Sequence, residues 1–349
     1  MFQSQNNSPV RFAVLGYGRI GKRHAETIAD NPEAHLVAAC DVLPISRLEN
    51  LPPDILFFHA LDDLLRADCE VDVVNICTPN GLHAEQAIQI LEARKHVVIE
   101  KPMALTKLDC ERVIHKALNV SRQVFCVMQN RYSPPAVWLK QLVDTQKLGN
   151  IYLVEINCYW NRDHRYYFPD GQKHAWKGTK QLDGGVFIHP NLLIFIDIFI
   201  LDFLEILFFI SGKFLKFNSK IETELEDNGI LQFELLRGGL GSFTYSTACW
   251  HNNFESTLTV IGEKGTIKIG GQYMERVEYC QVEHYEMPVL QPTNPSNEYR
   301  GYVGSAANHQ YVIQNVIDVL RGRETPTTNA LEGMKVVDII ERMYQAGIA

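Results

Sequence analysis

The sequence lacks several features that mark particular classes of protein. Its eight cysteines never form a C-x-x-C pair, so no zinc or redox motif is present and we expect no metal site. It also contains no internal repeat, no low-complexity tract and no long run of like charges, which argues against a solenoid or a disordered chain. The formal net charge of -8 argues against a nucleic acid as partner.

Signals for secretion and for crossing a membrane are also missing. The first ten residues, MFQSQNNSPV, have neither the basic start nor the apolar core of a secretory signal. The most apolar stretch, residues 182–213, contains Asp197, Asp202 and Glu205, each of which would cost about 2.5 to 3.5 kcal/mol near a bilayer centre. These acids share one arc of a helical wheel and leave a broad apolar face. We therefore expect a cytoplasmic protein without a membrane partner, and a buried helix over this stretch.

The composition is that of a folded globular protein. Hydrophobic residues make up 46% of the sequence and charged residues 21%, and 349 residues suffice for two domains with separate cores. A polar, proline-containing segment near residue 130 marks the expected boundary. We predict a first domain over residues 1–130 and a second over residues 131–349.

A dinucleotide-binding pattern opens the first domain. A short apolar strand at residues 11–15 leads into Gly16-x-Gly18-x-x-Gly21, and a helical pattern follows. Gly16 permits the tight turn, Gly18 lets the backbone approach a pyrophosphate, and Gly21 allows the helix to lie close to the strand. The helix N-terminus, with Arg19 and Ile20, then faces the phosphates. An ordinary turn is the alternative for a lone glycine motif, but the strand and helix around this one favour a cofactor site.

The choice between NAD and NADP depends on the end of the next strand. That strand, HLVAACD, ends on Asp41, twenty residues after Gly21. A carboxylate there accepts hydrogen bonds from the adenosine ribose and repels a 2′-phosphate, and no arginine stands directly beside it. The pattern therefore predicts NAD as the cofactor.

Strands and helices continue to alternate up to about residue 121, which predicts a doubly wound parallel sheet. Ligands bind beyond the carboxyl ends of such strands, where two polar motifs occur. The first motif is Thr78-Pro79-Asn80, followed by His83, and the second is Glu100-Lys101-Pro102. A solvated surface lysine is the alternative for Lys101, but it follows a wholly apolar run, which favours a position in the site.

The second half of the chain predicts a helix near residues 136–149 and several strands that form one large, mostly antiparallel open sheet. Ahead of the apolar stretch, residues 164–180 combine aromatic rings with basic side chains. This combination suits a sugar ring that carries phosphate or carboxylate. A solvated loop is the alternative for any one of these residues. The candidate substrate-binding residues are Arg131, Tyr132, Arg165, Trp176, Lys177, Gly178, Thr179, Asn308 and His309.

The glycine motif, the Thr78-Pro79-Asn80 turn with His83, and Glu100-Lys101-Pro102 together resemble the Gfo/Idh/MocA oxidoreductase family. The resemblance implies an α/β protein, with a Rossmann domain that binds NAD and a second α/β domain with an open sheet. It further implies that Lys101 is catalytic, that Glu100 and the Thr78-Pro79-Asn80 turn line the cofactor, and that the protein is a homo-oligomer, a dimer or a tetramer.

Within the family, Trp176-Lys177-Gly178-Thr179, GTIKIGG and SAANH resemble bacterial dehydrogenases that oxidise UDP-N-acetylglucosaminuronic acid at C3 during surface polysaccharide synthesis. One feature departs from the family pattern. Relatives carry a histidine eight residues after a Gly-Gly pair, and this sequence has Leu193 there. His189 is the nearby histidine that could substitute for it. A misread stretch of DNA over residues 190–208 is one explanation, which resequencing the gene tests.

The sequence therefore predicts an NAD-dependent oxidoreductase that acts on a secondary hydroxyl of a nucleotide-linked sugar, with Lys101 and His189 as candidate catalytic residues. A dehydrogenase of free sugars or inositols is an alternative within the enzyme class. A catalytically silent NAD-binding protein is the alternative outside it, and Leu193 is its main support.

Overall fold

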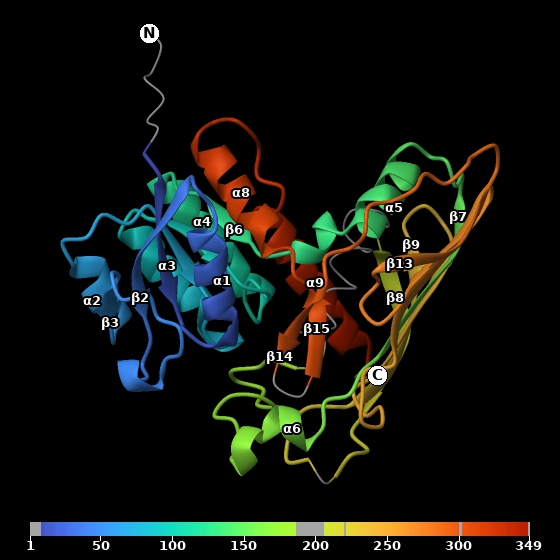
Figure 1. The fold of residues 1–349 in the computed structure, drawn as a ribbon. Coiled ribbons are helices and arrows are strands. Elements are labelled where there is room, and N and C mark those ends of the chain that lie inside the picture. Colours follow the sequence, from blue (N-terminus) through green and yellow to red (C-terminus); the bar gives the residue numbers. More distant parts are fainter. Residues whose placement is uncertain (1–7, 186–205, 220, 300–301, 348–349) are drawn as a thin grey trace. The chain divides into compact units, whose positions relative to one another are not determined.

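The computed structural model describes residues 8–185, 206–219, 221–299 and 302–347, and it divides into two compact units (Figure 1). The first unit comprises residues 1–128 and 309–337, and the second comprises residues 129–308 and 338–349. The α/β class predicted from the sequence is confirmed, and each unit contains its own large sheet.

The first unit is built on a six-stranded parallel sheet. Its strands lie in the order β3 (Leu56–Phe58), β2 (Ala34–Cys40), β1 (Val10–Leu15), β4 (Val73–Ile76), β5 (His96–Ile99) and β6 (Val124–Cys126). The β4 strand is buried at every residue, as expected for a strand that is covered on both faces. The strand order reverses between β1 and β4, which is the point where doubly wound sheets bind their ligands.

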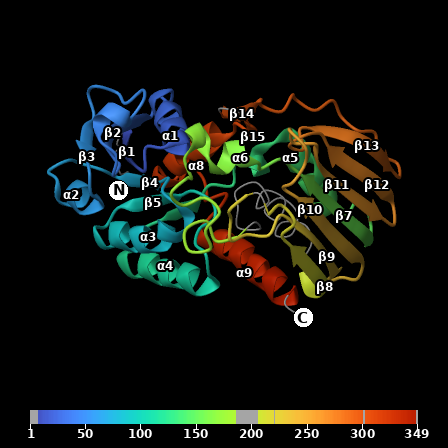
Figure 2. The same cartoon turned by 90° about the horizontal axis from the view of Figure 1, so that it is seen from below.

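Helices cover both faces of this sheet. They are α1 (Arg19–Ala29), α2 (Leu61–Arg66), α3 (His83–Glu92), α4 (Lys107–Val120) and α8 (His309–Leu320), with short 3₁₀ turns η1 (Ile45–Arg47) and η2 (Asn80–Leu82). Figure 2 shows α3 and α4 side by side on one face, and α1 and α8 on the other. Thr106 caps α4 by accepting a hydrogen bond from the backbone N–H of Asp109, which sets where that helix begins.

The chain returns to the first unit after it has formed most of the second. Residues 309–337, which the sequence analysis assigned to the second domain, belong to the first unit. The apolar face of α8, with Val312, Ile313 and Val316 buried, packs against α1. Glu33 forms ion pairs with two arginines just after α8, Arg321 and Arg323. These contacts join segments almost 300 residues apart, so local sequence patterns do not report them.

The second unit contains a seven-stranded sheet. Its strands lie in the order β13 (Arg276–Val282), β12 (Gly265–Gly270), β11 (Glu255–Gly262), β7 (Ile151–Tyr159), β10 (Leu240–Ser246), β9 (Asn228–Leu235) and β8 (Ile206–Leu215). Only the β7–β10 pair among them is parallel, so the predicted mostly antiparallel sheet is confirmed. The other elements are η3 (Gln129–Tyr132), α5 (Pro134–Asp144), α6 (His164–Tyr167), η4 (Pro169–Gly171), β14 (Ser296–Tyr299), β15 (Tyr302–Ala306) and α9 (Ala330–Ala346), whose first residues belong to the first unit.

Side chains alternate between the two faces of this second sheet. On β9, Leu231 and Phe233 are buried, whereas Ile230 and Gln232, which alternate with them, are exposed. Phe243 on β10 pairs in register with Leu231 and is buried with it. The period of two places one apolar face in the core of the unit and leaves the other exposed in the chain as described.

The predicted helix over residues 182–213 is wrong at its two described ends. Residues 182–185 are not helical, and residues 206–213 belong to the strand β8, which pairs antiparallel with β9. The run from Ile206 to Ile210 is apolar at every position, and such a run fits a strand as well as a buried helix. Pairing with β9 decides in favour of the strand. Residues 186–205 lie outside the described residues.

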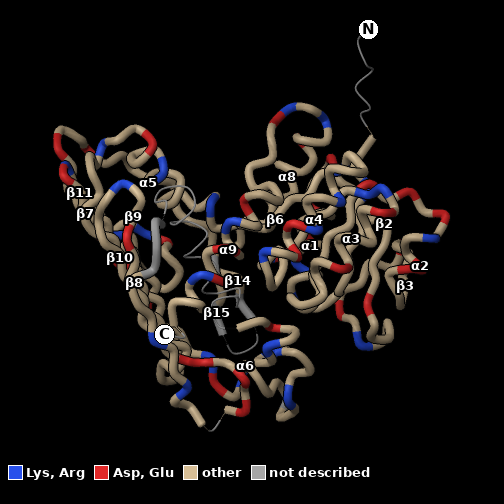
Figure 3. Tube along the Cα trace, turned by 180° about the vertical axis from the view of Figure 1, so that it is seen from behind, with Lys and Arg blue, Asp and Glu red and all other residues tan. Residues whose placement is uncertain are grey.

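Two further features agree with the composition. All eight cysteines are free thiols, five of them buried and three partly exposed. Lysines and arginines are interspersed with acidic residues in both units (Figure 3).

Among the described residues, no helix is both long and apolar enough to cross a membrane.

Candidate active site

The glycine motif forms the turn between β1 and α1. Gly16 has φ +87°, and a Cβ on it would lie 2.8 Å from the backbone of Cys77. A Cβ on Gly21 would lie 1.9 Å from the carbonyl oxygen of Gly16, so helix and strand approach each other too closely for a side chain. Around Gly18, in contrast, nothing lies within 4 Å of such an atom. The turn therefore leaves open space at Gly18, in front of the α1 N-terminus, and this space fits the pyrophosphate of a dinucleotide.

Two more predicted cofactor residues, Arg19 and Ile20, begin helix α1. Arg19 is exposed and Ile20 is partly buried. The α1 N-terminus has no side-chain cap, and the N-terminus of a helix is a place where an anionic ligand binds favourably.

Asp41 follows β2 directly and ties that strand to the glycine turn. One of its carboxylate oxygens accepts a hydrogen bond from the backbone N–H of Tyr17 at 2.6 Å, and the other accepts one from Leu43 at 2.8 Å. A carboxylate can accept about four hydrogen bonds, so acceptor positions remain for ribose hydroxyls. The position and charge of Asp41 thus fit the NAD adenosine.

His83 joins the two polar motifs at the carboxyl ends of β4 and β5. Its Nε2 lies 2.9 Å from the carbonyl oxygen of Thr78, and its Nδ1 lies 2.7 Å from that of Pro102. Burial lowers the pKa of His83, although the carbonyl contacts partly oppose this shift. Both ring nitrogens thus face backbone carbonyl oxygens, and His83 connects the two motifs through these contacts. Thr78 and Pro79 are partly exposed and Asn80 is buried beside them.

Glu100 and Lys101 follow β5, and both are buried, at 6% and 8% exposure. Glu100 Oε2 accepts the backbone N–H of Lys101 at 3.1 Å and lies 3.9 Å from the Lys101 ammonium. Burial raises the pKa of Glu100, but the Lys101 charge and two histidines outweigh it and hold that pKa well below its usual range. The site therefore contains an ionised glutamate beside a lysine, both removed from water.

The two histidines near Glu100 come from distant parts of the chain. His24 Nε2 on α1 lies 3.0 Å from Glu100 Oε1, and His309 Nε2 at the start of α8 lies 3.4 Å from the same oxygen. Asn75 on β4 contacts His24 Nδ1 at 2.9 Å. Neither His24 nor Asn75 was among the predicted site residues. Their one sequence signal is position, because His24 lies on the buried face of α1 and Asn75 is a polar residue in a buried strand.

The pair predicted at the start of α8 is divided between the two units. Asn308 belongs to the second unit, where its side chain accepts a hydrogen bond from Asn294 at 2.7 Å and donates one to Ser133 at 3.0 Å. His309 belongs to the first unit and faces Glu100. Both were predicted to bind substrate, and the structure gives each of them partners within its own unit.

In the second unit, the Trp176–Thr179 segment forms a tight turn. The Thr179 hydroxyl donates to the carbonyl oxygen of Trp176 at 2.7 Å, and Gly178 has φ +79°. The backbone N–H of Gly178 donates to Asp183 Oδ2 at 2.7 Å. Burial raises the pKa of Asp183 to about 6, opposed by that hydrogen bond and by the charge of Lys177.

Two buried cations lie against one aromatic ring beside this turn. The Lys177 ammonium is 3.9 Å from the centre of the Tyr166 ring, and the Arg162 guanidinium is 5.2 Å from it. Arg162 also lies 4.7 Å from the Trp160 ring. Arg162 was not among the predicted site residues, although it stands next to the basic aromatic segment. Cations on aromatic faces suit an anionic, ring-shaped ligand.

The remaining predicted substrate residues are more exposed. Arg165 pairs with Asp163 at 2.8 Å, and Asp163 also caps α6 by accepting the backbone N–H of Arg165. Arg131 and Tyr132 lie on η3 and are partly buried. His189 and Leu193 lie outside the described residues.

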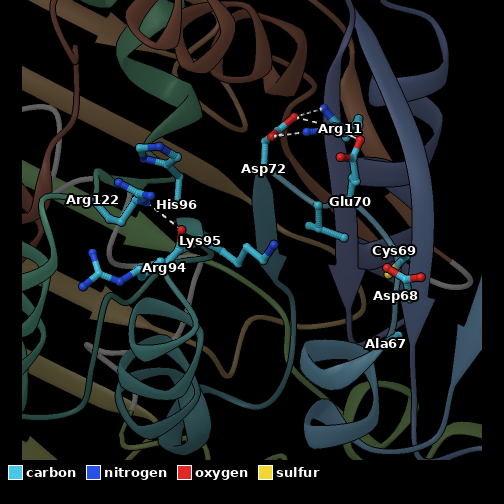
Figure 4. A pocket seen from close by; sticks show the side chains of 11 residues that line it. Arg11, Ala67, Asp68, Cys69, Glu70, Asp72, Arg94, Lys95, His96 and Arg122 are labelled. Atoms are coloured by element: carbon cyan, nitrogen blue, oxygen red, sulfur yellow. Dashed lines mark hydrogen bonds and ion pairs between the residues drawn. The ribbon is translucent and has the colours of Figure 1, made fainter.

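A hollow of about 350 Å³ lies at the opposite edge of the first sheet, where strands begin rather than end (Figure 4). Arg11 at its rim pairs with Asp72 at 2.8 Å and also contacts Glu70. Arg122 donates to the backbone carbonyl of Arg94. These charges serve structural pairs, and the cofactor motifs lie at the other edge.

Two family models match the chain. The first, described as an oxidoreductase family NAD-binding Rossmann fold, matches residues 10–127. The second, described as the C-terminal alpha/beta domain of the same oxidoreductase family, matches residues 140–347.

Solved structures and curated relatives agree on the family. The chain is 28% identical to the WlbA dehydrogenase from Bordetella pertussis, solved with NADH and UDP-GlcNAcA, with a TM-score of 0.82 and 97% of each chain covered. The WlbA dehydrogenase from Chromobacterium violaceum has the same identity and TM-score. An inositol 2-dehydrogenase from Rhizobium meliloti is 31% identical over 150 residues, 42% of this chain and 44% of that protein. The chain thus spans less than half the length of the curated relatives it matches. With both family models matched in order, the chain belongs to the Gfo/Idh/MocA oxidoreductase family, and NAD is the cofactor of its Rossmann unit.

Proposed function

We propose that the protein uses NAD to oxidise a secondary hydroxyl of a nucleotide-linked sugar, C3 of UDP-N-acetylglucosaminuronic acid, in the synthesis of a surface polysaccharide. The buried Lys101 at the carboxyl end of β5 carries this proposal, because it places a basic side chain at the ligand-binding edge of an NAD-binding sheet. Similarity to two dehydrogenases solved with NADH and UDP-GlcNAcA, over nearly the whole chain, supports the substrate.

Oxidation of a secondary alcohol removes a hydride from carbon and a proton from oxygen. NAD, when bound, supplies the nicotinamide C4 that accepts the hydride. The chain must supply a base for the proton, and a general base typically contributes about 10²–10⁴-fold to the rate. We assign that role to Lys101, which takes the hydroxyl proton on Nζ. Nζ must be neutral to accept the proton, and Glu100 at 3.9 Å then balances the charge of the ammonium that forms.

We assign substrate binding to the second unit. Lys177 and Arg162 are buried cations on the Tyr166 ring and suit a sugar carboxylate or a phosphate. The Trp176–Thr179 turn orders the backbone beside them. The outer face of the second sheet exposes Leu153, Ile230 and Leu240, which supports a homo-oligomer formed through that face.

A dehydrogenase of free sugars or inositols is the second candidate, favoured by the matches to inositol 2-dehydrogenases. A silent NAD-binding protein is the third, favoured by Leu193 at the position of the family histidine.

The test is NADH formation from UDP-N-acetylglucosaminuronic acid, UDP-N-acetylglucosamine, glucose and myo-inositol, by the protein and by its Leu193→His variant. Turnover of the nucleotide-linked uronic acid at the highest kcat/KM supports the proposal. Higher kcat/KM for myo-inositol or glucose replaces it with the second candidate. Absence of turnover in both proteins, with NADH binding intact, favours the third.

A further inference from the structure

Glu100 is the centre of a buried polar cluster that the proposed reaction does not by itself require. The cluster consists of His24, Asn75, Glu100, Lys101 and His309, all in the first unit and all at most 8% exposed. They come from α1, β4, the end of β5 and the start of α8. Four separate elements thus each contribute at least one polar side chain to the cluster around Glu100.

The two carboxylate oxygens of Glu100 face different partners. Oε1 lies 3.0 Å from His24 Nε2 and 3.4 Å from His309 Nε2, whereas Oε2 faces Lys101. The ring centres of the two histidines are 5.3 Å apart in an edge-to-face arrangement. Glu100 therefore connects the histidines on one side with the candidate base on the other.

Asn75 determines which histidine nitrogen carries the proton. Its amide nitrogen is 2.9 Å from His24 Nδ1 and can only donate, so Nδ1 accepts and the proton of neutral His24 is on Nε2, directed at Glu100. His309 is neutral at pH 7, because burial lowers its pKa to about 4. Both rings can then offer an N–H to Glu100 Oε1 without adding charge.

We propose that His24 and His309 are positioning residues, which act through Glu100 to hold the Lys101 side chain in place as the base. Together with Lys101, the two histidines that face Oε1 keep the Glu100 carboxylate ionised, and their contacts fix its orientation, so that Oε2 presents a charge to Lys101 from one direction. This inference rests on the proposed function, in which Lys101 accepts the hydroxyl proton.

Two other titratable groups near Glu100, His83 and Cys77, are uncharged and so do not hold the Glu100 carboxylate ionised. The Glu100 charge also acts on His83 and Cys77. Burial lowers the pKa of His83 and raises that of Cys77, so both are neutral at pH 7. In the part of the chain that the structure describes, Lys101 is thus the remaining basic side chain that faces Glu100.

A metal ion is the competing interpretation of two histidines and a carboxylate. Their ligand atoms lie within 4.8 Å of one another. A divalent cation there would lie next to Lys101 with a single carboxylate to balance its two charges, which leaves buried charge uncompensated. The hydrogen bond between His24 Nε2 and Glu100 Oε1 and the 3.4 Å approach of His309 Nε2 to the same oxygen involve these groups without that cost.

The test compares variants that keep or remove the N–H directed at Glu100. In His24→Gln and His309→Gln an amide can replace the N–H, and in His24→Leu and His309→Leu it is lost. For the leucine variants we expect kcat to fall about 10-fold and the acid limb of the kcat–pH profile to move about one pH unit lower. The glutamine variants should recover most of both effects. The larger effect is expected at His24, which lies closer to Glu100.

Glu100→Gln is the reference, because the histidines are proposed to act through it. In the double variant Glu100→Gln/His24→Leu, the acid limb of the kcat–pH profile should lie at the same pH as in Glu100→Gln alone, since the carboxylate is already absent. A leucine variant whose kcat falls while the acid limb of its kcat–pH profile stays in place would show a merely structural role and overturn the proposal. A further shift of this acid limb in the double variant would also overturn it. If His24→Leu does not fold, His24→Asn, whose shorter amide cannot reach Oε1, replaces it.

A second readout does not depend on turnover. Histidine ¹⁵N chemical shifts of the NAD-bound protein at pH 7 should show His24 and His309 neutral, with the proton on Nε2. A charged ring, the other tautomer, or stoichiometric metal in the purified protein would overturn the inference. If these shifts are as expected but no sugar is oxidised, the proposed function fails while the arrangement around Glu100 stands.

Discussion

Gly21 lies so close to Gly16 that a Cβ on Gly21 would be 1.9 Å from the Gly16 carbonyl oxygen, while a Cβ on Gly18 would meet nothing within 4 Å. Gly18 and Gly21, three residues apart, therefore serve different purposes. Gly21 permits helix and strand to pack, and Gly18 keeps space for a ligand.

We predict that Gly18→Ala leaves the melting temperature without cofactor nearly unchanged and weakens NADH binding at least about tenfold, because the added methyl occupies the space of the pyrophosphate. Gly21→Ala should lower the melting temperature markedly, since the backbone must move. Thermal melts and fluorescence titration with NADH measure both effects. Equal NADH affinity in Gly18→Ala and the unmodified protein would contradict the assignment.

The preference for NAD should depend on the charge of Asp41. Asp41→Asn keeps an oxygen that can accept from the backbone of Tyr17 but removes the negative charge that repels a 2′-phosphate. We expect NADPH to bind more tightly and NADH somewhat less tightly than in the unmodified protein. Titrations of both reduced cofactors test this, and tighter binding of NADPH by the unmodified protein would contradict the role of Asp41.

Removing the Lys101 amine should abolish most turnover without loss of the fold. Lys101→Met keeps an apolar stem of similar length, so NADH affinity should change little, while kcat falls by about 10²–10⁴-fold. The same substitution in the Leu193→His variant is the matched control for the missing family histidine. Unchanged kcat in either background would remove Lys101 from the mechanism.

Stability should decrease in mild acid because of His309. Its folded pKa of about 4 lies below the usual 6.5, so between these values the unfolded chain binds more protons and the free energy of unfolding rises with pH. The contribution is present above pH 6.5, is lost as the pH falls toward 4, and amounts to about 3 kcal/mol at most. Urea unfolding of the unmodified protein and of His309→Leu at pH 5 and 7 should show a smaller pH dependence in the variant. Identical pH dependence would mean that His309 does not titrate in this way.

The predicted fold agrees with the structure wherever a local pattern was sufficient. The apolar run of β1, the glycines and the amphipathic α1 are contiguous, so their order predicts the strand, turn and helix that the structure contains. The motifs after β4 and β5 were placed correctly at strand ends, because parallel strands present their carboxyl ends at one edge. For β8, an all-apolar run fits helix and strand alike, and only the hydrogen bonds to β9 distinguish them.

The sequence by itself determined the alternation of strands and helices in the first unit, its glycine turn and the place of Lys101 after a buried strand, since each depends on residues that are neighbours in the chain. Only the tertiary structure decided that His309 faces Glu100 and His24, although 209 and 285 residues separate it from them. His309 reaches Glu100 and His24 because α8 belongs to the first unit, where its apolar face packs against α1. Burial of such a face is favourable against any matching surface, so the pattern of α8 predicts a helix but not the surface on which it packs.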